Sequence, residues 1–220
     1  SLVLSNNWMA QSLSFNCEYD KALHCWESAL EINIKANSLW GISAMKANMA
    51  MFVYTQQGKI DTAYETSRET LQIADESGDV FSKAQAYTAH GWSYYHKGYL
   101  KEAKEYLLKG AEFSEKINMF YLAGIAHFGL ANTYFDREEY NISQQHYERS
   151  ISHCRHTFPS WYTANKIAIE LSQVMNKDKN KTLNKIFKLH EDIKIKWIEG
   201  LASNYIGEFL LNIDDQHISE

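Results

Sequence analysis

The sequence predicts an all-α fold, and specifically an α-solenoid of antiparallel helix pairs. A short block of residues recurs about every 40 positions, and a fixed period in this range is typical of stacked supersecondary units. The 220 residues include one proline, Pro159, and ten glycines, so little in the chain interrupts long helices. Small and aromatic residues also recur at spacings of three and four, which places them on one face of a helix.

In each copy of the recurring block, a large apolar or aromatic residue stands three positions before a small one. The copies occupy residues 18–22, 59–63, 99–103 and 139–143, and they end on Ala22, Ala63, Ala103 and Ser143. These small residues are 41, 40 and 40 positions apart. Because small side chains let two helices approach closely, we expect them to lie at helix contacts.

The period divides the chain into five units and part of a sixth. The units cover residues 1–37, 38–78, 79–118, 119–158, 159–193 and 194–220. Helices are predicted near residues 38–57, 60–77, 79–97, 100–117, 119–137 and 140–155, and then near 160–175, 182–191 and 194–213. The polar residues 176–181 predict a turn between two of the last helices.

Turn and cap residues support these boundaries. Gly78 can end one helix in a left-handed conformation, and Asp79 can cap the next helix through its carboxylate. Gly98 predicts the end of that helix. Pro159 suits the first residue of a helix, where its missing N–H costs nothing. The two aspartates at 214–215 are expected to cap whatever element follows.

This layout resembles the tetratricopeptide repeat. In that family a small residue is followed by an aromatic one, a glycine, a hydrophobic residue, an alanine, a large residue and a second small residue. The third unit follows this pattern with Gly91, Tyr94, Gly98, Leu100, Ala103, Leu107 and Gly110. The second has Met51, Tyr54, Gly58, Ile60, Ala63, Ser67 and Thr70; the fourth has Ala131, Tyr134, Glu138, Tyr140, Ser143, Tyr147 and Ser150; the first has Ala10, Leu13, Cys17, Tyr19, Ala22, Trp26 and Ala29. The resemblance covers about residues 1–156 and implies a right-handed superhelix.

Two features depart from the family. Its usual period is about 34 residues, and its proline after the second helix is missing here. Long, proline-poor repeats are similar to the arrays of large bacterial signal-responsive proteins. In those proteins the array follows an ATPase module linked to a DNA-binding or nucleotide-cyclase domain. The block pattern starts again at residues 218–220, so we expect the chain to be a piece of a longer protein.

The resemblance implies a concave groove lined by the first helix of each unit. The inward positions lie three before, one after and four after the first small residue of the pattern. They are Asn7, Gln11 and Ser14 in the first unit, and Asn48, Phe52, Thr55, Thr88, Trp92, Tyr95, Phe128, Asn132 and Phe135 in the next three. Aromatic rings together with amides and hydroxyls suit a bound peptide or helix. The alternative is that rings such as Trp92 and Phe128 pack on adjoining helices.

The same groove lacks the basic clamp with which some family members hold the C-terminal carboxylate of heat-shock chaperones. The matching positions here are Met45, Asn48, Gln85, Thr88, Ala89 and Trp92. We therefore do not expect an adaptor for chaperone tails.

No sequence pattern indicates catalysis or a cofactor, and we predict that this segment is not an enzyme. The chain has neither type of phosphate-binding glycine loop and no nucleophile elbow. His153 and His156 share a helical face, but they supply two of the four ligands of a structural zinc site, so we predict no metal there. His90 and His127 are predicted to be partly buried histidines that are hydrogen-bonded to a neighbour.

Charge, cysteine content and hydropathy limit the classes of partner and the cell compartment that we expect. The net charge of −5 argues against general nucleic-acid binding, and the lysines between residues 177 and 188 are interpreted as the polar side of an amphipathic helix. Cys17, Cys25 and Cys154 follow no ligand or disulfide spacing, which predicts free thiols in a reducing cytoplasm. No run of about 18 apolar residues occurs, so no transmembrane helix is expected.

The main functional hypothesis is non-catalytic protein recognition, by the sensor or scaffold segment of a larger cytoplasmic signalling protein. The alternative is a small-ligand sensor that regulates an attached cyclase, ATPase or DNA-binding domain. A peptide partner predicts a long open groove, whereas a small effector predicts a closed pocket walled by Trp92, Tyr95 and Phe128. We also expect apolar residues of the last segment, such as Ile206 and Leu210, to contact another copy of the chain or to be poorly ordered.

Overall fold

The computed structural model describes residues 1–154, 159–176 and 183–212, and this part of the chain is helical with no strand. The elements are α1 (Leu2–Phe15), α2 (Tyr19–Lys35), α3 (Leu39–Met49), the π-helical turn η1 (Ala50–Tyr54), α4 (Ile60–Ser77), α5 (Val80–His96), α6 (Leu100–Lys116), α7 (Phe120–Phe135), α8 (Tyr140–Cys154), α9 (Pro159–Met175), α10 (Leu183–Glu191) and α11 (Lys196–Asn212). The helices predicted from the sequence are therefore confirmed. Residues 177–181 and 214–215, where a turn and a cap were predicted, lie outside the described residues.

One predicted helix has an irregularity. The helix expected over residues 38–57 begins as α3 and then widens into η1, where the Thr55 N–H donates to the carbonyl of Ala50 at 3.2 Å. Such π-helical turns often occur at functional sites. This one ends two residues before Gln56, a residue of the candidate site.

The turns repeat as the sequence does. Residues with positive φ follow the first helix of four successive units at Cys17, Gly58, Gly98 and Glu138. They follow the second helix of three units at Asn37, Gly78 and Asn118. In the first three units both chain reversals therefore recur at the same positions, so in this part of the chain the period of the sequence is also a period of backbone conformation.

The predicted contact positions are buried. Ala22, Ala63 and Ala103 have no exposed surface. A Cβ atom on Gly91 would lie 2.6 Å from Cγ of Leu107, so α5 and α6 approach too closely for any side chain there. The small residues of the pattern thus set the spacing within a helix pair.

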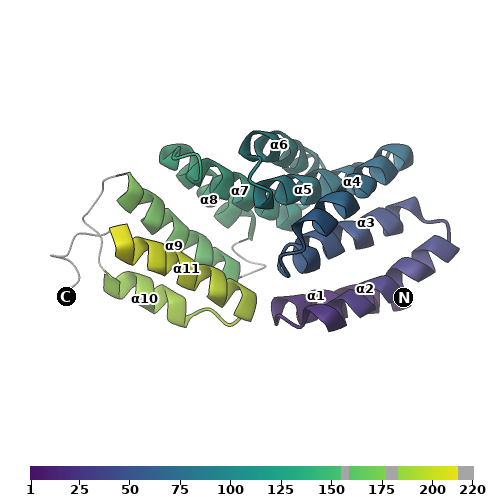
Figure 1. Ribbon diagram of the computed structural model, residues 1–220, viewed down its shortest axis with the longest axis horizontal. Helices are drawn as coiled ribbons and strands as arrows, with labels where there is room; N and C mark the ends of the chain where they lie inside the picture. Colours follow the sequence, from purple (N-terminus) through teal and green to yellow (C-terminus); the bar gives the residue numbers. More distant parts are fainter. Residues whose placement is uncertain (155–158, 177–182, 213–220) are drawn as a thin grey trace.

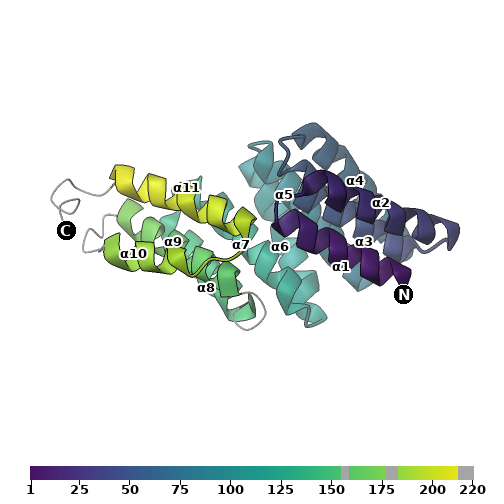
Figure 2. The same ribbon diagram turned by 90° about the horizontal axis from the view of Figure 1, so that it is seen from below.

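From α1 to α9, each helix packs against the next one along the chain. Figures 1 and 2 show that the array curves, so that the start of α11 lies beside the end of α1. Helix α11 packs mainly on α9 and also contacts α1 and α10. The first and the last described helices thereby meet on the concave side of the curve.

The expectation for the last segment was wrong for Ile206. This side chain is 93% buried within the same chain, because α11 lies on α9 rather than facing outward. Leu210 is half-buried and packs at the edge of the same core. Within the described residues, none of the helices combines the length and the apolar character needed to cross a membrane.

Candidate functional site

The nine groove residues predicted in the second, third and fourth units divide into three sets. Trp92, Tyr95, Phe128, Asn132 and Phe135 line one cavity, which we call the inner pocket. Phe52 lines a smaller apolar space beside it. Asn48, Thr55 and Thr88 line neither space.

These last three residues have local partners instead. Asn48 donates through Nδ2 to Oδ1 of Asn7 at 3.0 Å. The Thr55 hydroxyl donates to the carbonyl of Met51 at 2.6 Å. Thr88 is fully buried where α5 approaches Gly110. In this structure they hydrogen-bond or pack within and between helices.

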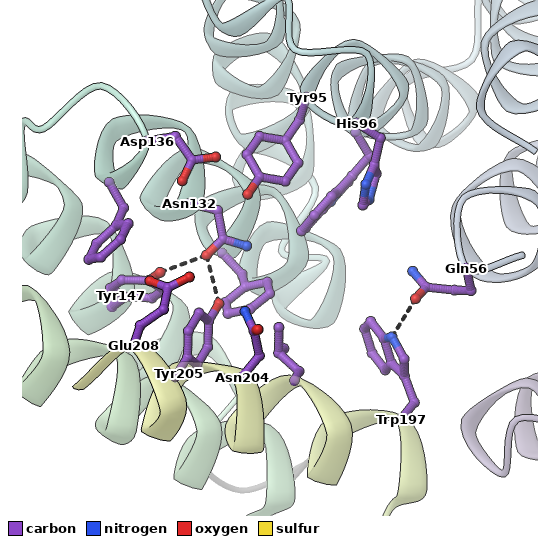
Figure 3. A pocket seen from close by; sticks show the side chains of 14 residues that line it. Gln56, Tyr95, His96, Asn132, Asp136, Tyr147, Trp197, Asn204, Tyr205 and Glu208 are labelled. Atoms are coloured by element: carbon purple, nitrogen blue, oxygen red, sulfur yellow. Dashed lines mark hydrogen bonds between the residues drawn. The ribbon is translucent and has the colours of Figure 1, made fainter. Parts of the chain in front are cut away.

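Helix α11 lies across the inner face and is anchored there by Trp197. The Trp197 ring stacks on Phe15, with 6.0 Å between centroids, and lies 5.2 Å from the Trp161 ring. Its indole N–H donates to Oε1 of Gln56 at 2.7 Å (Figure 3). The groove that the first helices would form is therefore covered at this point by the chain itself.

The inner pocket is what remains between α11 and the first helices. Its volume is about 180 Å³. It is lined by Gln56, Trp92, Tyr95, His96, Phe128, Asn132, Phe135, Asp136, Tyr147, Trp197, Leu201, Asn204, Tyr205 and Glu208. Figure 3 shows the labelled side chains converging from α5, α7 and α8, from Asp136 after α7 and from Gln56 after η1 on one side, and from α11 on the other.

Aromatic rings form much of the pocket wall. Trp92 lies 5.8 Å from Phe128 and 5.6 Å from Tyr95, the latter in an edge-to-face arrangement. Phe128 is buried against Trp161 and Tyr147. The rings pack on one another and are thus held in place before any ligand binds.

Asn132 joins the two sides of the pocket. Its Oδ1 accepts hydrogen bonds from the hydroxyls of Tyr147, at 2.6 Å, and Tyr205, at 2.9 Å (Figure 3). Burial raises the pKa of both tyrosines far above the ordinary value, so both remain hydroxyl donors. The amide of Asn132 thereby fixes α11 to α7 and α8.

Two carboxylates lie at the end of the pocket opposite Gln56. Asp136 stands beside Tyr95, and Glu208 approaches from α11 (Figure 3). Burial raises the pKa of both groups, and the negative charge of Asp136 raises that of Glu208 further. No lysine or arginine is among the residues that line the pocket. No lysine or arginine among the lining residues therefore balances these two carboxyl groups.

A second group of polar side chains lies outside the inner pocket, where α6, α7 and α8 meet. Nε2 of His127 is 3.0 Å from Oε1 of Glu115, and Nε2 of His153 is 3.4 Å from the same oxygen. Nδ1 of His127 lies 3.0 Å from Nδ1 of His146. His127 is buried, and this burial lowers its pKa. We call Glu115, His127 and His153 the histidine–glutamate cluster.

The two histidines predicted to be buried and hydrogen-bonded are confirmed. His90 and His127 are each 98% buried. Nδ1 of His90 is 2.9 Å from the hydroxyl oxygen of Ser67. His153, by contrast, is more than the solvated helix end that the sequence suggested, because it faces Glu115.

Sequence reasoning did not place several residues at the inner pocket, among them Gln56, Asp136, Trp197, Tyr205 and Glu208. Gln56 and Asp136 each directly follow a predicted groove residue, so proximity was a usable signal for them. The sequence contains no such signal for Trp197, Tyr205 and Glu208, because the repeat pattern alone does not place α11 against α7. Glu115 likewise had no signal that linked it to His127 or His153.

The comparisons with known proteins give no assignment. The chain matches no family model, and no curated protein matches it.

Proposed function

We propose that this chain is a tetratricopeptide-like solenoid that works as the ligand-sensing segment of a signalling protein. Its ligand is a small organic cation, and the binding site is the inner pocket. The observation that carries this proposal is an aromatic pocket whose lining carboxylates, Asp136 and Glu208, face no lysine or arginine. The repeated turns and buried small residues support the solenoid assignment.

A small ligand fits this geometry better than a peptide does. A peptide needs a long open groove, but Trp197 and Tyr205 hold α11 over the positions where the peptide would lie. The remaining space of about 180 Å³ is walled by Trp92, Tyr95 and Phe128. Pockets for drug-sized ligands are larger, roughly 300–1,000 Å³, so a compact ligand is expected.

The chemistry of the walls favours a cation. Aromatic faces attract ammonium groups by about 0.5–2 kcal/mol each, more when water is excluded. A carboxylate beside them adds a direct charge pair. The raised pKa values of Asp136 and Glu208 mean that their charged forms are disfavoured in the empty pocket. A bound cation relieves that cost, whereas an anion adds to it.

The position of α11 links binding to a change in the protein. The pocket has Tyr95 and Asp136 on the body of the array and Asn204 and Glu208 on α11. A ligand that contacts both sides binds the docked arrangement of α11 more tightly than an undocked one. Ligands shift a conformational equilibrium by this difference in affinity, so the effector would stabilise the docked α11.

The proposal is tested with small cations of defined chemistry. We expect tetramethylammonium or putrescine to raise the melting temperature and to bind in isothermal titration calorimetry, and glutarate to do neither. Asp136→Asn and Glu208→Gln should each weaken binding at least tenfold. Glu199→Gln is the matched control, because Glu199 is an exposed carboxylate on the same helix as Glu208. Preferential binding of glutarate would contradict the charge argument, and no binding of any of these probes would contradict the ligand proposal.

A scaffold role is the second candidate function, because large apolar side chains are exposed on α1 and at the start of α3. Trp8 is 64% exposed, Leu4 is 51% exposed and Trp40 is 43% exposed. Exposed apolar patches of this kind are common at protein-binding surfaces. None of these three residues lines the inner pocket, so both functions are compatible in one chain.

A further inference from the structure

We propose that Glu115, His127 and His153 form a binding site for a divalent transition-metal ion of the zinc type. The three residues lie near the end of α6, in the middle of α7 and near the end of α8. Their ligand atoms all lie within 4.8 Å of one another. The site is distinct from the inner pocket, and it does not depend on the function proposed above.

The distances suit a metal centre. Oε1 of Glu115 lies 3.0 Å from Nε2 of His127 and 3.4 Å from Nε2 of His153. Metal–ligand bonds of about 2.0–2.1 Å in a tetrahedral site place neighbouring ligand atoms about 3.3 Å apart. Two of the three ligand pairs therefore already have the required separation. The third pair, Nε2 of His127 and Nε2 of His153, lies within 4.8 Å, and the partly exposed His153 ring would have to turn for all three atoms to bind one ion.

The donor set also fits. Two imidazole nitrogens and one carboxylate oxygen are typical ligands of zinc sites that keep a fourth position for water. The Glu115 side chain is 44% exposed, so an ion can reach the cluster from the side of this carboxylate. Imidazole and carboxylate ligands also suit cobalt(II), and this allows a spectroscopic test.

A further histidine holds the central ligand in the required orientation. His127 uses Nδ1 to contact Nδ1 of His146 at 3.0 Å, which leaves Nε2 directed at Glu115. Metal-binding histidines almost always engage their second nitrogen in this way, and the partner fixes the ring and its tautomer. With a metal on Nε2, His127 donates its Nδ1 proton to His146. His146 is thus a positioning residue.

Aromatic stacking supports the outer ligands. The Phe120 ring stacks on His153 with 5.8 Å between centroids, and Tyr134 stacks on His146 with 5.2 Å between centroids. The His127 and His153 rings are themselves nearly parallel, with 3° between their planes. The rings are thus restrained on several sides, which lowers the entropy lost when an ion binds.

Hydrogen bonds alone offer a competing account. If both imidazoles carry a proton on Nε2, both can donate to Oε1 of Glu115 without a metal. The two accounts differ in an observable way. A hydrogen-bonded cluster has no saturable affinity for an ion, whereas a metal site binds one ion per chain and depends on all three side chains.

The test is a metal titration of the whole chain after treatment with a chelator. Cys17→Ser and Cys25→Ser are introduced first, because both thiols are at least partly accessible and can bind zinc on their own. In this background we expect one equivalent of zinc per chain, by elemental analysis after dialysis, and a higher melting temperature. Cobalt(II) should give visible absorption bands typical of a four-coordinate ion.

Variants separate the cluster from other histidines. Glu115→Gln and His153→Gln alter partly exposed side chains and should weaken metal binding at least tenfold with unchanged helical circular dichroism. His146→Gln should weaken binding about 10–100-fold, as is usual for a residue that orients a ligand. His24→Gln, at an exposed site elsewhere, should bind zinc as the parent does.

Two outcomes would overturn the proposal. One is the absence of a bound equivalent in the folded parent protein. The other is zinc binding that stays unchanged in both Glu115→Gln and His153→Gln.

Discussion

Trp197 in α11 donates its indole N–H to the side chain of Gln56, which lies 141 positions earlier in the chain, at 2.7 Å. The same ring stacks on Phe15 at the end of α1. Through these contacts the last described helix is joined to the first units of the array. The inner face is thereby converted from a groove into a pocket.

Replacing Trp197 with alanine should destabilise the protein by about 3 kcal/mol, because a large ring in contact with the rings of Phe15, Phe52 and Trp161 is lost from the inner face. Urea unfolding measures this change. Leu211→Ala is the matched control on the same helix, since Leu211 is 85% exposed and its loss should cost less than about 0.5 kcal/mol. Equal stabilities for the two variants would mean that α11 is not docked in solution.

Phe128 belongs to the hydrophobic core and also lines the pocket. Phe128→Ala should therefore lower the free energy of unfolding by about 3–5 kcal/mol. Its side chain is 99% buried and lies 4.8 Å from the Trp161 ring. The milder Phe128→Leu should retain much of this stability and allow ligand binding to be measured. Thermal unfolding followed by circular dichroism distinguishes the variants. A melting temperature of Phe128→Ala equal to that of the parent would show that the ring is not packed.

Two glycines should respond to alanine in opposite directions. Gly91→Ala should destabilise strongly, because the new methyl group would lie 2.6 Å from Cγ and 2.9 Å from the backbone nitrogen of Leu107. Gly200 lies within α11 with no neighbour inside 4 Å of an added Cβ. Gly200→Ala should therefore stabilise by about 0.5–1 kcal/mol through helix propensity alone. Chemical denaturation of both variants checks the sign of each effect.

His90 should make the protein sensitive to mild acid. Burial, with a smaller contribution from Arg68, lowers the pKa of His90 from 6.5 to about 4. The unfolded chain then takes up a proton more readily than the folded one, so stability is complete above about pH 6.5 and falls as the pH decreases toward 4. Protonation of His90 lowers the free energy of unfolding by at most about 3 kcal/mol.

The measurement is the free energy of unfolding at several pH values between 4 and 7. His90→Gln should be less stable at pH 7 but should show a shallower decline toward pH 4 than the parent. An identical decline of the free energy of unfolding in both proteins would mean that His90 is not the group responsible. The other buried histidines would then be the next to replace.

The local structure was predictable from sequence because its determinants are close together in the chain. Asp79 caps α5, with its carboxylate accepting from the Ser82 N–H at 2.7 Å, as the sequence indicated. Pro159 begins α9, and the recurring small residues lie at helix contacts. Each of these features depends on backbone conformation over a few residues, or on the repeat that places the same contact in every unit.

Part of the pocket was predictable for the same reason. The resemblance to the tetratricopeptide repeat implied a common inward face for Trp92, Tyr95, Phe128, Asn132 and Phe135, and these residues do line one cavity. The pattern also selects Thr88, which the close approach of Gly110 buries between helices instead. Position in the repeat therefore identifies a face but not the depth of each side chain.

The covering of that face depends on contacts between units that are far apart in the chain. The repeat determines how one unit sits on the next, but small rotations accumulate along an array, and their sum decides whether distant units meet. Here the sum brings Trp197 to Gln56 and Tyr205 to Asn132, contacts that span 141 and 73 positions. The histidine–glutamate cluster, by contrast, joins single residues on the three consecutive helices α6, α7 and α8, and the positions of these residues in the repeat do not reveal that their side chains meet. Short-range sequence thus specifies the helices, their turns and their packing faces, whereas the closure of the array in three dimensions creates the pocket.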